Sequence, residues 1–293
     1  MIQGAITAIV TPFNADYTVD FDGFERVIHH QLNGNIDGIV VCGSTGEAIT
    51  MTLEERCAVI ERAVKIVNRR KPVIAGTSSS STRETCDATK RAHDLGADGV
   101  LIAAPAYNRP QQEGLYQHFA AVAQAVPEYP VMLYNIPGRT AVNISTEVIL
   151  RLVRDYPRSF LSYKDATNNL KQADELLTQC PDLLFLSGDD AATLPLGAMG
   201  AKGIVSVVGN LVPQAMHRLS AEILRGDFAR AREQHRKVVP LIDACFVESN
   251  PAPVKLGCSL LGLCHERTRA PLAPCTDKTR EIMKRALTEF GAL

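Results

Sequence analysis

Short apolar runs recur along the chain, and each is followed by a longer stretch with the polar and apolar spacing of a helix. The runs are rich in Val, Ile, Leu and Ala with few polar interruptions, which is typical of strands covered on both faces. We expect strands at residues 5–10, 38–41, 72–76, 99–103, 131–134, 160–163, 183–186 and 203–207. This alternation predicts βα units and a parallel sheet.

Helix signals between the runs support this interpretation. Thr52 is followed three residues later by Glu55, a pairing that favours a helix start there. The stretch 83–95 is followed by Gly96, a residue that favours a helix end. Eight strands, each followed by a helix, predict a (β/α)8 TIM barrel. An open doubly wound sheet is the alternative, but its usual Gly-rich fingerprint does not follow the first strand.

The pattern changes after the eighth strand. From there on only helical stretches are expected, at residues 214–225, 228–246, 253–261 and 277–290. The first of these can serve as the last barrel helix. We therefore predict a barrel catalytic domain at residues 1–226 and a C-terminal helical appendage, packed on the barrel, at residues 227–293.

Composition narrows the class of protein. The chain has 293 residues with 31 Lys and Arg against 32 Asp and Glu, which gives no electrostatic argument for nucleic acid or a membrane surface as partner. No apolar run approaches the roughly 20 residues that span a bilayer, and residues 1–13 do not have the pattern of a signal peptide. The eight cysteines form no CxxC pair, which favours reduced thiols and a cytoplasmic location.

Polar segments follow five of the predicted strands. They lie at residues 43–47, 105–110, 134–139, 163–166 and 187–190. A barrel builds its active site from the loops at the carboxyl ends of its strands. We therefore expect the hydroxyls, the lysine and the arginine of these segments to converge on one mouth.

Lys164 is the strongest candidate for chemistry. It follows the apolar run 160–163, so its amine should be partly desolvated. Desolvation lowers the pKa of a lysine and leaves the neutral amine that attacks a carbonyl. A lone lysine at a strand end more often extends to solvent. Convergence with Tyr134 and Arg139 favours a nucleophile that forms a Schiff base with a small 2-oxo acid.

The neighbouring polar residues fit that reaction, although each has a plainer interpretation. Tyr134 could carry a proton if its hydroxyl lies within reach, or it could be a buried aromatic. Ser44 and Thr45 could pass the proton on or hold a carboxylate, or simply form a polar turn. Arg139 could hold a carboxylate with two hydrogen bonds, or form a surface ion pair.

Two further features do not imply a metal. Asp189 and Asp190 are adjacent and have no third ligand at metal-binding spacing, so a helix N-cap is expected there. His29 and His30 lie on a predicted outer helix, which favours a solvated face over a pair of ligands.

Taken together, the motifs at residues 43–47, 107–110, 134–140 and 187–190 resemble those of the dihydrodipicolinate synthase and N-acetylneuraminate lyase family. The resemblance covers essentially the whole chain and extends to the segment 250–255. It implies that Lys164 forms a Schiff base with pyruvate, whose enamine attacks aspartate semialdehyde on the route to diaminopimelate and lysine. No cofactor is implied.

The resemblance also implies roles for other residues. Tyr134, Ser44 and Tyr107 match a proton relay in which the tyrosine at 107 reaches across a subunit interface. A second group matches binding positions: Thr45 for the pyruvate carboxylate, Arg139 for the semialdehyde carboxylate, and Gly188 and Val205 as pocket lining. Members of the family are usually homotetramers built from two tight dimers.

Departures from the family pattern keep alternatives open. Ser44 stands where threonine is usual in the synthases, and Ala106 where they have a second tyrosine. The alternative enzyme is therefore a pyruvate-dependent aldolase or lyase that acts on a sugar acid or another 2-oxo acid. A non-catalytic barrel is the third reading, but it would not need to preserve Lys164. The positions that bind inhibitory lysine keep only one residue of the inhibited pattern, Glu84; they read Ala48, Ile49, Leu53, Arg56, Ser80 and Glu84. We expect lysine to inhibit weakly or not at all.

Overall fold

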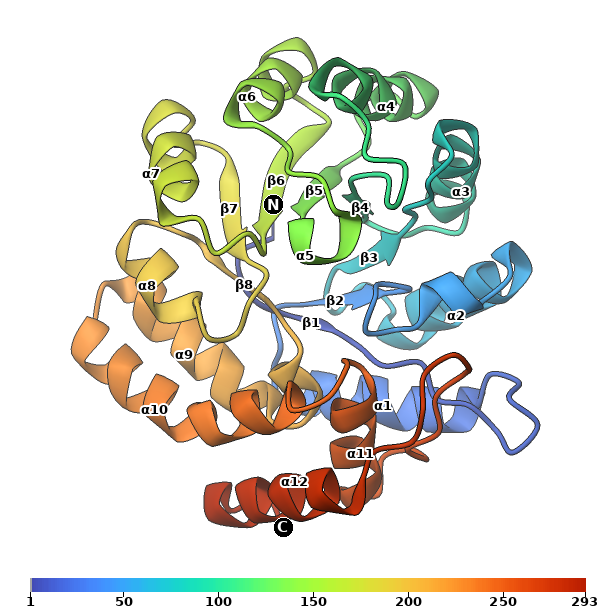
Figure 1. Cartoon of the computed structure of the whole chain (residues 1–293), viewed down its shortest axis with the longest axis vertical. Helices are drawn as coiled ribbons and strands as arrows, with labels where there is room; N and C mark the ends of the chain where they lie inside the picture. Colours follow the sequence, from blue (N-terminus) through green and yellow to red (C-terminus); the bar gives the residue numbers. More distant parts are fainter. Residues whose placement is uncertain (1) are drawn as a thin grey trace.

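The computed structural model describes residues 2–293 and shows a closed barrel of parallel strands surrounded by helices (Figure 1). Each strand pairs with the next along the chain, and β8 pairs with β1 to close the barrel. The strands are β1 (Gly4–Ala8), β2 (Gly38–Val41), β3 (Val73–Gly76), β4 (Gly99–Ala103), β5 (Val131–Asn135), β6 (Phe160–Asp165), β7 (Leu184–Ser187) and β8 (Gly203–Ser206). The predicted TIM barrel is confirmed.

Helices follow the strands in the order that the sequence predicts. The α-helices are α1 (Phe21–Asn33), α2 (Leu53–Val67), α3 (Thr82–Asp94), α4 (Gln112–Ala125), α5 (Pro137–Thr140), α6 (Thr146–Asp155), α7 (Leu170–Gln179), α8 (Thr193–Ala198), α9 (Pro213–Arg225), α10 (Phe228–Cys245), α11 (Ala252–Leu260) and α12 (Asp277–Phe290). Two 3₁₀ helices, η1 (Ala48–Thr50) and η2 (Val208–Asn210), lie in the loops after β2 and β8. The sequence pattern did not predict the short elements η1, η2 and α5. None of the helices in residues 2–293 is both long and apolar enough to cross a membrane.

Local sequence signals set the helix ends as expected. Thr52 Oγ1 accepts a hydrogen bond from the Glu55 backbone at 3.2 Å, and the Glu55 carboxylate accepts one from the Thr52 backbone at 2.9 Å. These two bonds satisfy backbone N–H groups that the first turn of α2 leaves free. Gly96 follows α3 with a φ of +84°, a left-handed conformation that costs glycine little.

The barrel wall separates two apolar cores. The larger core lies between the strands and the surrounding helices, and the smaller one fills the barrel interior. Because side chains alternate along a strand, Met132 and Tyr134 of β5 join the inner core while Leu133 joins the outer one. At the matching register on β6 stand two polar residues, Ser162 and Lys164. The inner core is therefore interrupted at β6.

One strand boundary differs from the prediction. We expected the sixth strand to end at Tyr163, with Lys164 beyond it, but β6 continues to Asp165. Lys164 pairs in register with Tyr134 of β5 and Leu186 of β7. The flanking strands keep the backbone extended past the apolar run, because each offers hydrogen-bonding partners there. Lys164 is thus held on a rigid strand.

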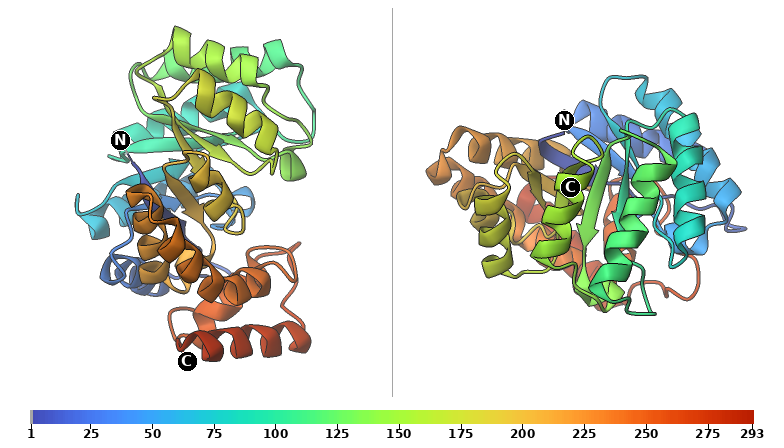
Figure 2. Two further views of the ribbon diagram at one scale, coloured as in Figure 1. Left: turned by 90° about the vertical axis from the view of Figure 1, so that its left-hand side faces the viewer. Right: turned by 90° about the horizontal axis from the view of Figure 1, so that it is seen from above.

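The C-terminal helices pack against one another at one side of the molecule. α10 packs against α9 and α12, and it also contacts α8. Figure 2 shows α11 and α12 at one end of the long axis. α11 and the segment before it reach back to the barrel mouth, where Lys255 and Asn250 contact the turn after β2.

Candidate active site

Lys164 and Tyr134 lie side by side inside the mouth of the barrel. Their register on β6 and β5 points both side chains inward, and Lys164 Nζ lies 4.0 Å from the centroid of the Tyr134 ring. Both residues are buried, with 5% and 6% of their surfaces exposed. The structure therefore brings the predicted nucleophile and the predicted proton carrier together.

Burial changes the acid–base chemistry of this pair. Desolvation lowers the pKa of the Lys164 amine to about 7, the Asp190 carboxylate opposes this shift, and the Arg139 cation adds to it. Near neutral pH a large fraction of the amine is therefore unprotonated and able to attack a carbonyl. Burial raises the pKa of Tyr134 well above its usual range. Its hydroxyl stays protonated and can donate.

The two adjacent aspartates do not cap a helix, which corrects the prediction for Asp190 and Asp189. α8 begins only at Thr193, and no side chain caps it. Asp190 is buried and accepts hydrogen bonds from Ser206 Oγ at 2.5 Å and from the Val207 backbone at 2.9 Å. Its pKa is raised to about 6 by burial, partly offset by these hydrogen bonds. Asp190 therefore ties the loop after β7 to β8 and adds a negative charge near Lys164.

Gly188 and Val205, the two predicted pocket-lining residues, lie directly after β7 and on β8. A Cβ atom on Gly188 would stand 2.9 Å from Lys164 Cε and 2.8 Å from the Asp165 carbonyl, so only glycine leaves room for the lysine stem. Val205 is buried in the inner core together with Tyr134 and Leu186. Gly188 borders Lys164, Val205 lies in the same inner core as Tyr134, and the role of both as pocket lining stays a prediction.

The turn after β2 presents one buried and one exposed hydroxyl. Thr45 is 4% exposed, and its Oγ1 accepts a hydrogen bond from Asn250 Nδ2 at 3.0 Å. Ser44 is exposed, and among residues 2–293 only its backbone carbonyl takes part in a hydrogen bond, accepting from the Glu47 backbone at 3.1 Å. The sequence reasoning assigned no role to Asn250, because it lies 205 residues from Thr45 along the chain.

Arg139 and Tyr107 occupy the rim of the mouth. Arg139 lies on α5 and is exposed, and its Nη2 donates to the Asn250 carbonyl at 3.2 Å. Tyr107 has a left-handed φ of +75° and is 96% exposed. No hydrogen bond holds its hydroxyl within the described chain. The relay from Tyr134 through Ser44 to Tyr107 is therefore not formed by hydrogen bonds in one subunit and stays a prediction.

A buried polar network supports Lys164 from outside the barrel. Asn135 Nδ2 donates to the Tyr163 hydroxyl at 3.0 Å, which in turn donates to Asp165 at 3.1 Å. Thr167 donates to the same carboxylate at 2.9 Å. Because Tyr163 and Asp165 flank Lys164 on β6, their fixed positions restrict the lysine backbone. An alternating strand with polar residues facing outward could have signalled this network.

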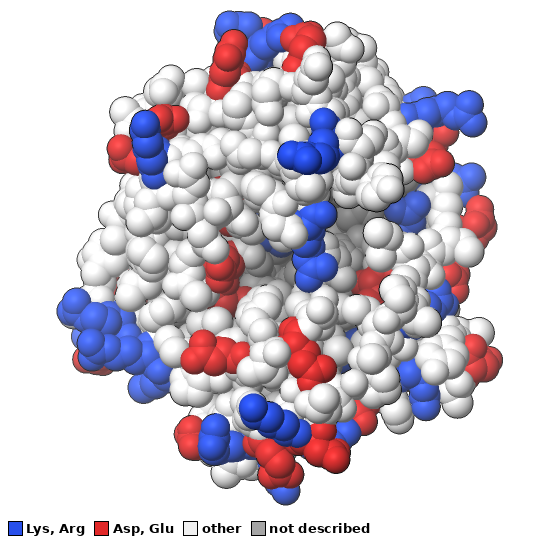
Figure 3. All heavy atoms as spheres, in the orientation of Figure 1, with Lys and Arg blue, Asp and Glu red and all other residues white. Residues whose placement is uncertain are grey.

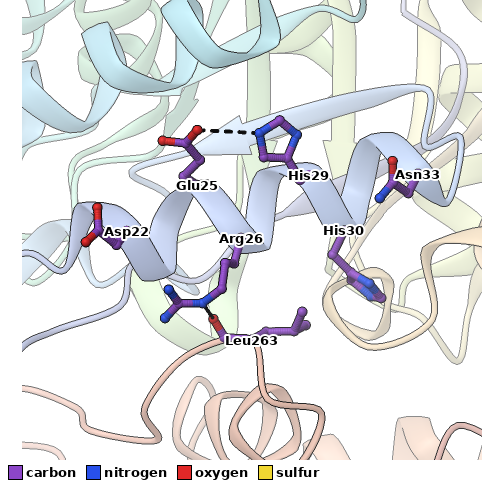
Figure 4. Close-up of a pocket in the computed structure, with 7 residues that line it drawn as sticks. All are labelled: Asp22, Glu25, Arg26, His29, His30, Asn33 and Leu263. Atoms are coloured by element: carbon purple, nitrogen blue, oxygen red, sulfur yellow. Dashed lines mark hydrogen bonds and ion pairs between the residues drawn. The ribbon is translucent and has the colours of Figure 1, made fainter.

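The barrel mouth and a hollow on α1 are two separate features of the molecule. Figure 3 shows a recess near the centre of the face seen in Figure 1, bordered by basic and acidic side chains. A second hollow lies on α1, between Glu25 and Leu263 (Figure 4). There His29 faces Glu25 at 3.6 Å, whereas His30 is half-buried with Nε2 3.1 Å from the Leu211 carbonyl. Only His29 fits the predicted solvated face.

The structure also shows whether side chains that could bind a metal ion lie close together. Within residues 2–293, no three His, Cys, Asp or Glu side chains come together in a way that could hold a metal ion. The mouth has a buried lysine, Lys164, and an exposed arginine, Arg139. The arrangement can form a covalent adduct with a carbonyl and hold a carboxylate beside it.

Comparison with known proteins supports this interpretation. The model of the dihydrodipicolinate synthetase family matches residues 1–290. The 4-hydroxy-tetrahydrodipicolinate synthase of Syntrophus aciditrophicus (strain SB) is 46% identical over 294 residues, which span 100% of each chain.

Two solved structures extend the likeness to the fold. The chloride-inhibited dihydrodipicolinate synthase from Acinetobacter baumannii, complexed with pyruvate, is 39% identical with a TM-score of 0.97 over 100% of each chain. The enzyme from Cyanidioschyzon merolae with lysine bound is 37% identical with a TM-score of 0.96, covering 100% of this chain and 99% of that one. The family match over nearly the whole length and the full-length relative at 46% identity show that this chain belongs to the dihydrodipicolinate synthetase family.

Proposed function

We propose that this chain is a 4-hydroxy-tetrahydrodipicolinate synthase, which condenses pyruvate with aspartate semialdehyde. The observation that carries the proposal is the Lys164 amine, buried inside the barrel mouth beside Tyr134 with a pKa lowered to about 7. A buried amine that is partly neutral at physiological pH is the group that Schiff-base chemistry requires.

The proposed reaction uses these side chains in order. The Lys164 amine attacks the C2 carbonyl of pyruvate, and Tyr134 supplies the proton that lets water leave as the imine forms. Loss of a proton from C3 gives the enamine, which attacks the aldehyde carbon of the second substrate. The amino group of that substrate then displaces Lys164 from C2 as the ring closes, and the free lysine is restored.

The two carboxylates of the substrates need separate partners. We assign the pyruvate carboxylate to Thr45 and the semialdehyde carboxylate to Arg139, because Thr45 is buried in the turn after β2 and Arg139 is exposed on α5. The named relative and the pyruvate complex favour this reading over a lyase for sugar acids.

We also propose a homotetramer made of two dimers. The exposed, left-handed Tyr107 supports this assembly, since its aromatic ring has no packing partner to offset the cost of its backbone conformation within the subunit. A second subunit could receive it. Sedimentation velocity would test the assembly.

The eight cysteines are all free thiols, which supports a reducing cytoplasmic location.

The proposal is tested by trapping the imine. Borohydride added with pyruvate should attach one reduced pyruvyl group, found on the Lys164 peptide by mass spectrometry. Lys164→Ala should abolish the label, and Lys171→Ala on α7 should retain it. A coupled assay should then show turnover of pyruvate with aspartate semialdehyde and none with N-acetylneuraminate. A label that persists in Lys164→Ala would contradict the proposal.

A further inference from the structure

A segment from the C-terminal part of the chain touches both side chains that we assign to substrate carboxylates. Asn250 Nδ2 donates to Thr45 Oγ1 at 3.0 Å, and the Asn250 carbonyl accepts from Arg139 Nη2 at 3.2 Å. Asn250 is itself buried, with 7% of its surface exposed. One residue thus connects the inner and outer carboxylate positions.

A buried ion pair fixes this segment against the turn after β2. Lys255 Nζ lies 2.6 Å from Glu47 Oε1, and the side chains are 0% and 1% exposed. The other carboxylate oxygen of Glu47 accepts from the Arg269 backbone at 2.9 Å. Glu47 lies two residues after Thr45, and Lys255 lies five residues after Asn250. The pair therefore holds the Asn250 and Thr45 side chains in one arrangement.

The direction of the Asn250–Thr45 hydrogen bond matters for binding. A hydroxyl can donate one hydrogen bond, and a carboxylate can only accept. Because Thr45 Oγ1 accepts from the Asn250 amide, its own proton stays free for a substrate oxygen. With the amide reversed, Thr45 would donate to Asn250 and present lone pairs to the carboxylate.

The side-chain oxygen of Asn250, Oδ1, makes no hydrogen bond that would give the residue a second structural role. It is buried and has no hydrogen-bonding partner within residues 2–293. An unpaired buried acceptor costs stability, and such exceptions in folded proteins call for an explanation. The bond to Thr45 is the one hydrogen bond that the amide group makes in the described chain, which directs the explanation to Thr45.

We propose that Asn250 is a positioning residue that keeps the Thr45 hydroxyl oriented as a donor toward the carboxylate of the 2-oxo acid. This inference rests on the proposed function, since it requires a 2-oxo acid at Lys164. Asn250 acts through Thr45 and leaves the chemistry at Lys164 unchanged. It should therefore affect the pyruvate concentration needed for half-maximal trapping, and the yield at saturating pyruvate should stay the same.

Asn250→Asp tests the direction of the bond at nearly constant size. The new carboxylate can only accept, so it takes the Thr45 proton and repels the substrate. Half-saturating pyruvate in borohydride trapping should rise about ten- to a hundred-fold, as expected for a lost hydrogen bond to a charged group. Asn33→Asp adds the same charge on the exposed face of α1 (Figure 4) and should leave the value unchanged.

A double-mutant cycle separates positioning from a general loss of structure. Thr45→Val and Asn250→Ala should each weaken pyruvate binding, whereas the double variant should bind no worse than Thr45→Val alone. Thr45→Ser retains a hydroxyl, so adding Asn250→Ala to Thr45→Ser should still weaken pyruvate binding. Additive losses, or a Thr45→Val variant that binds normally, would overturn the inference.

Two further outcomes separate a failure of this inference from a failure of the proposed function. A wild-type protein that traps no pyruvate would overturn the proposed function and the inference with it. A wild-type protein that traps pyruvate, with Asn250→Asp half-saturating at the same concentration, would overturn the inference alone. If Asn250→Asp does not melt cooperatively, the cycle with Asn250→Ala decides.

Discussion

Single residues in this barrel take their chemistry from where the strands place them. Lys164 is flanked in register by Tyr134 and Leu186, which exclude water from its amine. Gly188 leaves the space that its stem occupies. Asp190 supplies the one opposing effect, an attraction that favours the ammonium form. The amine is thus held between two protonation states near neutral pH.

This balance predicts a pH dependence for imine formation. Because the pKa of Lys164 is lowered to about 7, the amine is neutral above that pH and protonated below it. The trapping rate at limiting pyruvate should rise with pH through a midpoint near 7. Asp190→Asn should move the midpoint lower, since the carboxylate supports the ammonium, while Asp22→Asn on α1 should not. A midpoint near the usual lysine value would show that desolvation does not control this amine.

Arg139 should discriminate between the two substrates. Removing its charge-assisted contact by Arg139→Ala should raise the KM for aspartate semialdehyde about ten- to a hundred-fold, with a much smaller change for pyruvate. Initial rates with each substrate varied in turn measure the difference. Arg158→Ala, on an exposed ion pair with Glu128, serves as the matched control. An unchanged semialdehyde KM with intact kcat would exclude this role.

At the scale of elements, the active site depends on a contact between distant parts of the fold. The turn after β2 carries Thr45 and Glu47, and α11 carries Lys255. The ion pair between Glu47 and Lys255 is fully buried, so neither charge is solvated if the other is removed. The Lys255 amine also lies 4.1 Å from the Phe13 ring centroid, which adds to its packing.

Breaking this pair from one side should therefore cost stability. Lys255→Met leaves Glu47 buried and unpaired, and we expect a loss of about 3–5 kcal/mol, the range for a broken buried ion pair. Urea unfolding followed by circular dichroism measures it. Lys284→Met on the exposed side of α12 should change little. Adding Glu47→Gln to Lys255→Met should recover part of the loss; a loss equal to that of Lys284→Met would contradict the argument.

At the scale of the whole molecule, closure of the barrel brings five loops and one C-terminal segment to a single mouth. The net charge of -1 gives no overall attraction for anionic substrates, so any attraction must come from local cations such as Arg139 at the rim. The division into a barrel at residues 1–226 and an appendage at 227–293 stays a prediction. In the structure, α10 packs on both α9 and α12.

We expect the molecule as a whole to respond weakly to free lysine. Inhibition should be weak or absent, because Leu53 and the 95% exposed Ile49 offer no partners for a charged ligand. The Glu84 carboxylate already accepts a hydrogen bond from Ser79 Oγ at 2.6 Å. Initial rates at saturating substrates with lysine up to millimolar concentration test this. Strong inhibition at sub-millimolar lysine would show the expectation to be wrong. The test is warranted because a relative's structure contains bound lysine.

What the sequence by itself determined depends on neighbouring residues. The apolar runs specified eight strands, the Thr52 and Glu55 pair specified a helix start, and Lys164 beside its run specified a desolvated amine. These features follow from side-chain periodicity, capping and local hydrophobicity. They can be read within a short window of the chain.

Only the tertiary structure decided which residues surround that amine. Asp190 reaches β8 instead of capping α8, β6 continues past the apolar run, and Asn250 meets Thr45 from 205 residues away. Each depends on partners that barrel closure brings together, and no local pattern encodes such a pairing. The sequence therefore predicted the nucleophile, whereas the fold supplied the groups that set its pKa and orient its binding partner.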